Sequence, residues 1–416
     1  MRAFSTLLFV LFALSANAAD RTVGTVSVQK GNNVSVNGEA PLSLTLDGKD
    51  HQSCQFLSKR APDENHEFTW KEVTTTRGGE LAEILGDQLR SVDSLVVKGN
   101  VNDKDFHAMW DASLYGYLSV INLKNAVLEN NAVPDTAFFH ENEQYEGSSH
   151  EIFYYIGLRK IILPEGLEKI GEGAFYQASA LRQVNFPSTL RYIGDFAFNA
   201  TKLEMNQLVI PEGVEEINQY AFAFCRKLKA QVTLPSTIKK IGEWAFYGCP
   251  ITSINLPEGL ESLGSLAFWD CDLREVSIPS SCHEFNEGWQ FGFNRNLEKM
   301  HLPEGMTEIP DHFAVDCFRL REVNFPHTLK HIGEKAFSLC ISLKNVELPL
   351  GMQSLGEEAF SELEALEQIV FPASMKSLGK NSCSYWKNIK RIYCAAMEPP
   401  VCDPTDGGVF SGFDFP

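Results

Sequence analysis

The sequence contains none of the short motifs that mark common catalytic sites. It has no G-x-S-x-G nucleophile turn, no glycine-rich phosphate-binding loop and no H-E-x-x-H zinc motif. Asp103 and Asp105 stand close together, but the glycine and the distal glutamate of a calcium loop are missing. We therefore expect no catalytic residue, no cofactor and no bound metal, and we expect that the protein is not an enzyme.

Basic residues are in the minority. The chain has 36 lysines and arginines against 54 aspartates and glutamates, and its formal net charge is −18. A surface of this charge repels nucleic acid and anionic membranes, so we expect neither as a partner. The simplest role of the charge is to keep an exported protein soluble, and binding of a basic partner or of cations is the alternative.

Long hydrophobic runs are missing except near the start of the chain. The run from Leu7 to Leu14 is too short to span a bilayer, and the small-x-small sequence Ala16-Asn17-Ala18 that follows is typical of a signal peptidase site. This predicts a cleaved signal peptide and no membrane insertion after cleavage. The first cysteine is Cys54, so no cysteine follows the cut site to carry an N-terminal lipid anchor. We expect a secreted, periplasmic or cell-surface protein.

A proline recurs through most of the chain at intervals of 22 to 24 residues. Self-similarity at such a period is typical of stacked repeats, which present an extended surface to their partners. The ten prolines are Pro164, Pro187, Pro211, Pro235, Pro257, Pro279, Pro303, Pro326, Pro349 and Pro372.

Each repeat has the same pattern around its proline. Apolar residues stand one and three positions before it with a polar residue between, as in Val184-Asn185-Phe186, and this alternation predicts a short strand that the proline ends. The pair Ala-Phe closes most repeats, as in Ala245-Phe246, and stacking would align these phenylalanines into one aromatic spine. We predict an α/β-type repeat solenoid. It would be a curved leucine-rich-repeat array with one parallel sheet of short strands and a mostly irregular or short-helical opposite face.

Two sequences alternate directly after the proline. Pro-Glu-Gly occurs at positions 164, 211, 257 and 303, and Pro-Ser-Thr or a relative occurs at positions 187, 235, 279, 326 and 372. Both are turn sequences. The alternation indicates that the underlying repeat is a double unit.

Written as a consensus, the repeat is L-x-x-V-x-F-P-x-x-L-x-x-I-G-x-x-A-F-x-x-C, and from about residue 92 to 394 it resembles the BspA-type leucine-rich repeats of exported bacterial proteins. The segment from Gly79-Glu80-Leu81 to Asp105 resembles the one that precedes the repeats in that family. Cys394-Ala395-Ala396 with Pro399-Pro400 resembles the one that follows them. The resemblance implies a non-enzymatic solenoid at the cell surface or outside the cell, with a role in adhesion to proteins or other cells.

These features divide the chain into five parts. An N-terminal β-rich cap would cover the open edge of the first repeat, and degenerate strands are expected at Leu95-Val96-Val97 and from Val120 to Leu123. We expect a monomer. The parts are residues 1–18 (signal peptide), 19–75 (cap), 76–150 (degenerate repeats with an acidic loop), 151–393 (BspA-type repeats) and 394–416 (C-terminal cap or tail).

Most cysteines occupy regular positions in the repeats. Equivalent positions in adjacent parallel strands lie about 4.8 Å apart, which is wider than the Cβ separation of roughly 3.5–4.5 Å in a disulfide. We therefore predict a ladder of free buried thiols, with Cys282 and Cys383 also in the core. Cys394 and Cys402 are the best candidates for a disulfide. The ladder consists of Cys225, Cys249, Cys271, Cys317 and Cys340.

Three regions are candidate ligand sites. The polar residues four and two positions before the prolines should face solvent on one continuous sheet, which suits a protein or a glycan. The other two are the irregular stretch 282–313, which holds Trp289 and His312, and the acidic loop 140–150 with Tyr145. Solvation and sequence drift are the alternatives for each. The strand-face candidates are Gln183, Asn185, Gln207, Gln231, Asn255, Glu275, Lys299, His301, Glu322 and Asn324.

Four histidines come from neighbouring repeats but occupy different positions in them. We do not expect them to converge on a zinc ion. They are His301, His312, His327 and His331.

The leading hypothesis is an exported recognition protein that binds a host or microbial protein. A glycan-binding accessory protein is the first alternative, and it would use an aromatic platform at Trp269 or Trp289. A structural spacer of the cell envelope is the second alternative, and it would have no specific ligand.

Overall fold

The computed structural model describes residues 66–139, 156–402 and 408–412, together with the backbone of five further strands. The predicted signal peptide at residues 1–18 and the loop 140–150 with Tyr145 lie outside the described residues. The chain divides into two compact units. The first contains residues 1–129, 137–162 and 177–181, and the second contains residues 130–136, 163–176 and 182–416.

The five backbone strands form a sheet in the order β2-β1-β3-β4-β9. The pairs β1–β2 and β3–β4 are antiparallel, whereas β1–β3 and β4–β9 are parallel. The segment predicted as a β-rich cap contains four of these strands, and its capping role stays a prediction. The strands are β1 (Gly24–Gln29), β2 (Asn33–Gly38), β3 (Ser43–Leu46), β4 (Ser53–Leu57) and β9 (Ile152–Tyr154).

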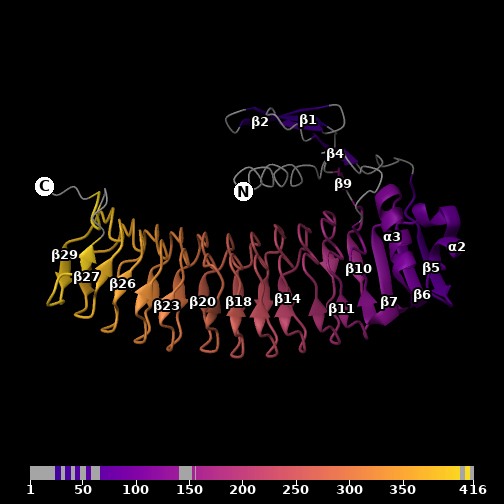
Figure 1. Ribbon diagram of the computed structural model, residues 1–416. Helices are drawn as coiled ribbons and strands as arrows, with labels where there is room; N and C mark the ends of the chain where they lie inside the picture. Colours follow the sequence, from indigo (N-terminus) through magenta and orange to yellow (C-terminus); the bar gives the residue numbers. More distant parts are fainter. Residues whose placement is uncertain are drawn as a thin grey trace. The chain divides into compact units, whose positions relative to one another are not determined.

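The rest of the first unit is built on parallel strands in the order β10-β7-β6-β5 (Figure 1). The degenerate strands expected near residues 95 and 120 are confirmed as parts of β6 and β7. The elements in chain order are β5 (Trp70–Thr75), α2 (Leu81–Leu85), η1 (Gly86–Arg90), β6 (Ser94–Val101), α3 (Asp103–Tyr115), β7 (Val120–Leu128) and β10 (Lys160–Ile162).

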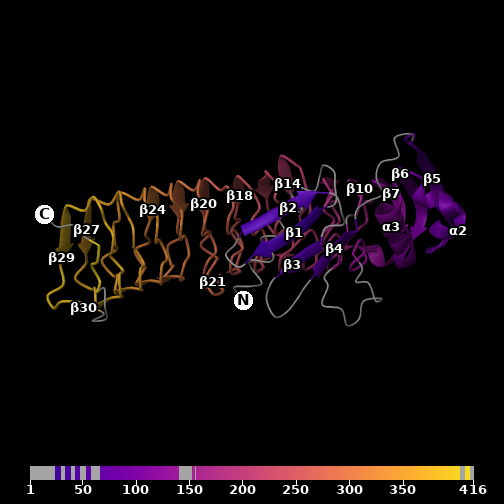
Figure 2. The same cartoon turned by 90° about the horizontal axis from the view of Figure 1, so that it is seen from above.

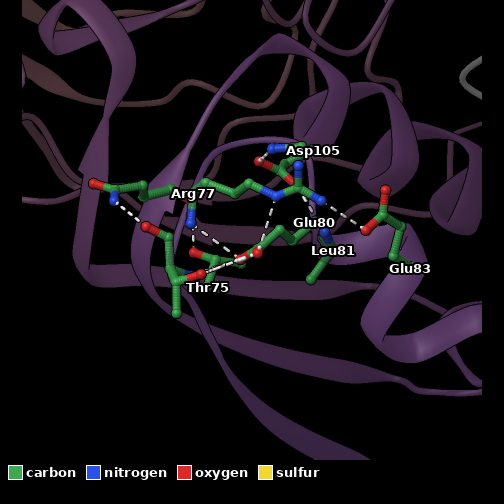
Figure 3. Close-up of polar contacts among 9 residues, drawn as sticks. Thr75, Arg77, Glu80, Leu81, Glu83 and Asp105 are labelled. Carbon is green, nitrogen blue, oxygen red and sulfur yellow. Dashed lines mark hydrogen bonds and ion pairs between the residues drawn. The ribbon is translucent and has the colours of Figure 1, made fainter.

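A buried carboxylate organises the start of α3 (Figure 3). Asp105 is 1% exposed, and its two oxygens accept hydrogen bonds from the backbone N–H groups of Gly79 at 2.7 Å, Leu81 at 2.9 Å and Asn102 at 3.0 Å. The Asn102 side chain accepts in turn from the N–H of Lys104, which completes a capping box. Asp105 therefore has a structural role.

A second carboxylate closes the loop before α2. Glu80 accepts hydrogen bonds from the N–H of Thr76 at 2.6 Å and of Arg77 at 3.0 Å, and the Arg77 guanidinium lies 3.2 Å from Glu80 and 3.1 Å from Glu83 (Figure 3). The backbone N–H groups of Arg77 and Thr76 lower the pKa of Glu80 to about 2. The segment that resembles the family's N-terminal flank is thus held together by carboxylates that accept from backbone N–H groups.

The second unit is a solenoid of parallel strands, so the predicted fold class is confirmed (Figure 1). We call the stretch from one repeat proline to the next a coil. Each first-ladder strand runs toward its proline, and register is kept from coil to coil, with Leu208 opposite Val232 and Val232 opposite Ile254. The first ladder contains the sheets β14-β16-β18, β20-β22-β24 and β27-β29. Its strands are β12 (Gln183–Val184), β14 (Gln207–Val209), β16 (Gln231–Thr233), β18 (Ser253–Asn255), β20 (Glu275–Ser277), β22 (Lys299–His301), β24 (Glu322–Asn324), β27 (Gln368–Phe371) and β29 (Arg391–Cys394).

A second parallel ladder of two-residue strands runs along the other side of the coils, where β21 and β30 are labelled in Figure 2. This ladder corrects one detail of the predicted fold, because we expected one parallel sheet and a mostly irregular or short-helical opposite face. The glycine that often follows each strand allows close approach, since a Cβ on Gly264 would lie 2.4 Å from the backbone nitrogen of Glu243. The sheets run β21-β19-β17-β15-β13-β11-β8 and β23-β25-β26-β28-β30. The strands are β8 (Ala132–Val133), which follows η2 (Glu129–Asn131), β11 (Lys169–Ile170), β13 (Tyr192–Ile193), β15 (Glu216–Ile217), β17 (Lys240–Ile241), β19 (Ser262–Leu263), β21 (Glu284–Phe285), β23 (Glu308–Ile309), β25 (His331–Ile332), β26 (Ser354–Leu355), β28 (Ser377–Leu378) and β30 (Val401–Cys402).

The predicted aromatic spine is confirmed. The ring of Phe246 stacks on Phe222 at 5.3 Å and on Phe268 at 5.6 Å, and all three side chains are fully buried. The backbone also pairs here, because the N–H of Phe246 donates to the carbonyl of Ala267 in the next coil at 2.9 Å. The stack runs through Phe175, Phe198, Phe222, Phe246, Phe268 and Phe291, and a second stack joins Phe337 to Phe360.

One coil interrupts the spine. Phe313 takes the position of the usual alanine and Ala314 that of the usual phenylalanine, since the N–H of Phe291 bonds to Phe313 and that of Ala314 bonds to Ala336. The displaced ring packs edge-on against Phe291 at 5.4 Å and against Phe285 at 5.7 Å. The irregularity at residues 282–313 therefore has a packing explanation.

The predicted ladder of free thiols is also confirmed. Each thiol is buried and donates to a carbonyl of the preceding coil, as Cys249 does to Phe222 at 2.9 Å. Burial raises the pKa of Cys317 to about 12, so its thiol stays neutral. The other hydrogen bonds of the ladder join Cys225 to Phe198, Cys271 to Phe246, Cys317 to Phe291 and Cys340 to Ala314.

The remaining cysteines divide into core and surface. Cys282 and Cys383 are buried, as predicted. The candidate disulfide between Cys394 and Cys402 is not formed, because both thiols are free and exposed. The reason is that the two strands continue different ladders, with β29 pairing to β27 and β30 pairing to β28.

The alternation of turn sequences has a structural basis in the contact between coils. The Glu212 carboxylate accepts from the N–H of Ser236 at 3.2 Å and from its hydroxyl at 3.0 Å, and the N–H of Gly213 donates to the Thr237 hydroxyl at 2.9 Å. Each Pro-Glu-Gly coil is thereby bonded to the Pro-Ser-Thr coil that follows. The other pairs are Glu165 with Ser188, Glu258 with Ser280, and Glu304 with His327.

Candidate functional site

The outer side of the first ladder, which we call the strand face, presents a row of polar side chains. In β16 the central Val232 is buried, whereas Gln231 and Thr233 are exposed, and β14, β18 and β20 show the same pattern. The predicted exposure of the strand-face candidates is confirmed, except for His301, which is half-buried. The strand face is thus an ordered polar surface that the repeat itself creates.

The strand face changes chemistry along the ladder. Gln207 lies opposite Gln231 in β14 and β16, so this part is neutral. Farther along, Lys299 lies opposite Glu275 and Glu322, and its ammonium is 3.3 Å from the Glu322 carboxylate. His301 also lies 3.2 Å from Glu275, so the charged candidates on β20, β22 and β24 have partners among themselves. Gln207 and Gln231 have no such partner within residues 156–402.

Three candidate asparagines have partners inside the protein. Asn324 accepts from the N–H of Leu302 at 2.8 Å and donates to the carbonyl of the same residue at 2.9 Å. Asn185 makes the same pair of bonds to Leu163, and Asn255 to Leu234. These amides replace ladder hydrogen bonds beside the proline, so they stabilise the contact between coils.

A shallow hollow of about 730 Å³ opens on the neutral part of the strand face. Gln207 and Gln231 differ from the asparagines, because no protein group within residues 156–402 bonds to their side-chain amides. The ammonium of Lys229 is unpaired in the same part of the chain. The hollow therefore offers hydrogen-bond donors and acceptors, together with a positive charge. Its lining is Asn206, Gln207, Lys229, Gln231 and Thr252.

The hollow lies where the coil length changes. The segment from Thr201 to Pro211 and the one from Cys225 to Pro235 each advance by ten positions, whereas the segment from Cys249 to Pro257 advances by eight. The lining residues come from two coils with long connections and from the next coil, whose connection is short. Sequence analysis missed Asn206, Lys229 and Thr252, although this change in spacing is visible in the proline intervals.

Four basic residues lie in the coils that line the hollow or in the coil before them, on a chain whose net charge is −18. Burial lowers the pKa of Lys202, the nearby positive charges of Arg182 and Lys227 lower it further, and the Glu204 carboxylate raises it. Arg182 is paired with Glu204, whereas Lys227 is exposed and has no ion-pair partner among the described residues. We call Arg182, Lys202, Lys227 and Lys229 the basic cluster.

The tryptophans of the irregular stretch are engaged in packing. Trp289 stacks on His312 at 3.6 Å and lies 5.2 Å from Trp269, whose ring lies 4.5 Å from Phe293. A Cβ on Gly292 would lie 2.1 Å from the Trp269 ring, so this ring also lies against backbone. One face of Trp289 is covered, which weakens the case for a sugar platform there.

The four histidines have separate partners. His301 bonds to Glu275, His327 to Glu304 at 3.0 Å and His331 to the Ser354 hydroxyl at 2.7 Å, while His312 lies 3.7 Å from Glu334. Within residues 66–139 and 156–402, no three histidine, cysteine, aspartate or glutamate side chains are grouped as metal ligands would be.

No helix in the part of the chain that the structure describes has both the length and the apolar character needed to cross a membrane.

Comparison with known protein families identifies the type of the repeats. The family model described as "BspA type Leucine rich repeat region (6 copies)" matches residues 148–231, 229–330 and 312–397. A search of curated protein sequences finds no match.

Solved structures of bacterial leucine-rich repeat proteins are similar over most of their length. A leucine-rich repeat protein from Bacteroides ovatus is 18% identical, with 90% of this chain and 93% of that chain covered and a TM-score of 0.46. A leucine rich cell surface protein from Faecalibacterium prausnitzii is 17% identical, with 91% and 96% covered and a TM-score of 0.37. The pneumococcal vaccine antigen PcpA is 18% identical, with 91% and 89% covered and a TM-score of 0.36.

Proposed function

Because the chain belongs to the family of BspA-type leucine-rich repeat proteins, we propose that it is an exported recognition protein that binds a protein ligand through its strand face. The observation that carries the proposal is the exposed row of Gln207 and Gln231, whose amides have no partner within residues 156–402. Buried polar groups at an interface need partners, so a ligand with complementary donors and acceptors is favoured there. Repeat arrays offer extended surfaces of this kind to their partners.

Export is supported by the apolar run and the Ala16-Asn17-Ala18 sequence at the start of the chain. We expect fractionation of the source cells to recover the mature protein in the medium, in the periplasm or at the surface, with an N-terminus near Ala19. An uncleaved protein that stays in the cytoplasm would refute this part of the proposal.

A binding screen tests recognition itself. The purified protein is presented to a panel of extracellular-matrix and serum proteins and, in parallel, to a glycan array. Wild type is compared with Gln207→Ala/Gln231→Ala on the strand face and with Lys239→Ala/Glu261→Ala, an ion pair of 3.3 Å at the second ladder. We expect a protein ligand whose binding is weakened by the first variant and not by the second. Binding to glycans alone, or equal loss in both variants, would contradict the proposal.

A further inference from the structure

The strand face is not uniform, and its hollow has a positive charge in the lining. The chain carries a net charge of −18, yet Lys202 is close enough to Arg182 and Lys227 for their charges to act on it. Lys229 lines the hollow next to Gln231. Like charges that lie near one another repel, so they favour the approach of an anion.

The charges at this place are not all neutralised from within. Among the described residues, Arg182 pairs with Glu204, but Lys227 and Lys229 have no ion-pair partner. The lysines on the opposite ladder differ, because Lys239 pairs with Glu261 and Lys240 with Glu216. Two exposed ammonium groups, at residues 227 and 229, are thus available to a ligand.

The uncharged lining indicates what else the ligand carries. Each glutamine amide offers two N–H donors and one carbonyl acceptor, which matches the N–H and C=O groups of an extended peptide. The Cα partners Gln207 and Gln231 stand in adjacent strands, about 4.8 Å apart. None of the five lining side chains is aromatic, so the hollow lacks the ring faces on which sugars stack.

From these observations we infer that the hollow and the basic cluster bind an extended acidic segment of the protein ligand. Its backbone would bond to Gln207 and Gln231, and its carboxylates would lie against Lys227 and Lys229. The inference rests on the proposed recognition function and names the chemistry of the partner. An acidic polysaccharide would share the charge but not the peptide backbone.

The direct test uses a short fluorescein-labelled peptide of alternating glutamate and serine, with a lysine–serine peptide as its counterpart, and measures anisotropy at low ionic strength. We expect the acidic peptide to bind and the basic one not to bind. Added salt should weaken binding, because salt screens exposed charges. Failure of the acidic peptide to bind, or equal binding of both peptides, would overturn the inference.

Two charge-matched variants localise the site. Lys227→Gln/Lys229→Gln should weaken binding of the acidic peptide by about tenfold, the effect of losing two charge-assisted contacts. Lys239→Gln/Lys240→Gln removes the same net charge at the second ladder and should change affinity by less than about twofold. Gln207→Ala/Gln231→Ala leaves the charge unchanged and should also weaken binding. Equal losses in the two lysine variants would show that only net charge matters and would overturn the site.

Competition separates the partner classes and the two proposals. A soluble polyuronate that binds more tightly than the peptide, and whose binding depends on Lys227 and Lys229, would replace the peptide by a polysaccharide. A protein ligand from the screen whose binding survives Lys227→Gln/Lys229→Gln would leave recognition standing and overturn the acidic segment. If the acidic peptide binds but the screen finds no protein ligand, the acidic site would stand and the proposed recognition of a protein would be contradicted.

Discussion

The aromatic spine predicts a large and local loss of stability when one ring is removed. Phe246 is fully buried, and its ring lies between Phe222 at 5.3 Å and Phe268 at 5.6 Å. Truncation of a buried phenylalanine to alanine costs about 3–5 kcal/mol, a sum that includes the stacking of the ring on both of its neighbours. In a linear array this loss falls on the two interfaces between coils that Phe246 joins. We expect Phe246→Ala to lower the free energy of unfolding of the second unit by that amount.

The assay is guanidinium unfolding followed by circular dichroism, with midpoint and slope compared between variants. Phe68→Ala is the control, because it makes the same chemical change at a side chain that is 68% exposed, and it should cost less than about 0.5 kcal/mol. A loss below about 1 kcal/mol for Phe246→Ala, or a loss equal to that of the control, would refute the view that the stacked rings hold the coils together.

Three further outcomes follow from the hydrogen bonds of carboxylates. Asp105→Ala should destabilise the first unit by about 3–5 kcal/mol because three backbone N–H groups lose a charged acceptor; a shift in urea midpoint that corresponds to less than about 1 kcal/mol would contradict this. The pKa of Glu80 is lowered to about 2, so its contribution to stability is present above the ordinary value of 4.5 and is lost as the pH falls toward 2. Glu80→Gln should therefore flatten the decline of the unfolding midpoint between these two pH values. A decline parallel to that of wild type would be evidence against this role of Glu80. Glu212→Ala removes two hydrogen bonds to Ser236 and should cost about 1 kcal/mol in thermal unfolding, whereas Glu347→Ala, at an exposed position, should cost less than about 0.5.

The sequence predicted those parts of the fold that depend on position within a coil. The spine and the thiol ladder follow from the repeat, because stacking brings equivalent residues such as Phe222 and Phe246 together. The second ladder was missed because strands such as Lys240–Ile241 have only two residues, too few to show an alternating pattern. The sequence left open whether Cys394 and Cys402 form a disulfide, because it does not show that their strands belong to different ladders.

The candidate site was predictable only in part. The exposure of Gln207 and Gln231 follows from the alternation along each strand. That Asn255 and Asn324 bond to the backbone of the preceding coil does not, because the distance from a side chain to a neighbouring peptide depends on the stacked geometry. The hollow depends on differences in length between coils, which a consensus averages away.

The bond between Glu212 and Ser236 has a consequence for how such a chain can change length. Within residues 156–402, a contact of this kind runs from a Pro-Glu-Gly coil to the Pro-Ser-Thr coil after it and not in the other direction. Removing one coil would therefore bring two turns of the same kind face to face. Insertion or deletion of two coils together keeps every such contact. The array can therefore lengthen or shorten in steps of two coils, or about 9.6 Å along its axis. A partner that reads several coils would meet the same turn chemistry only at every second one.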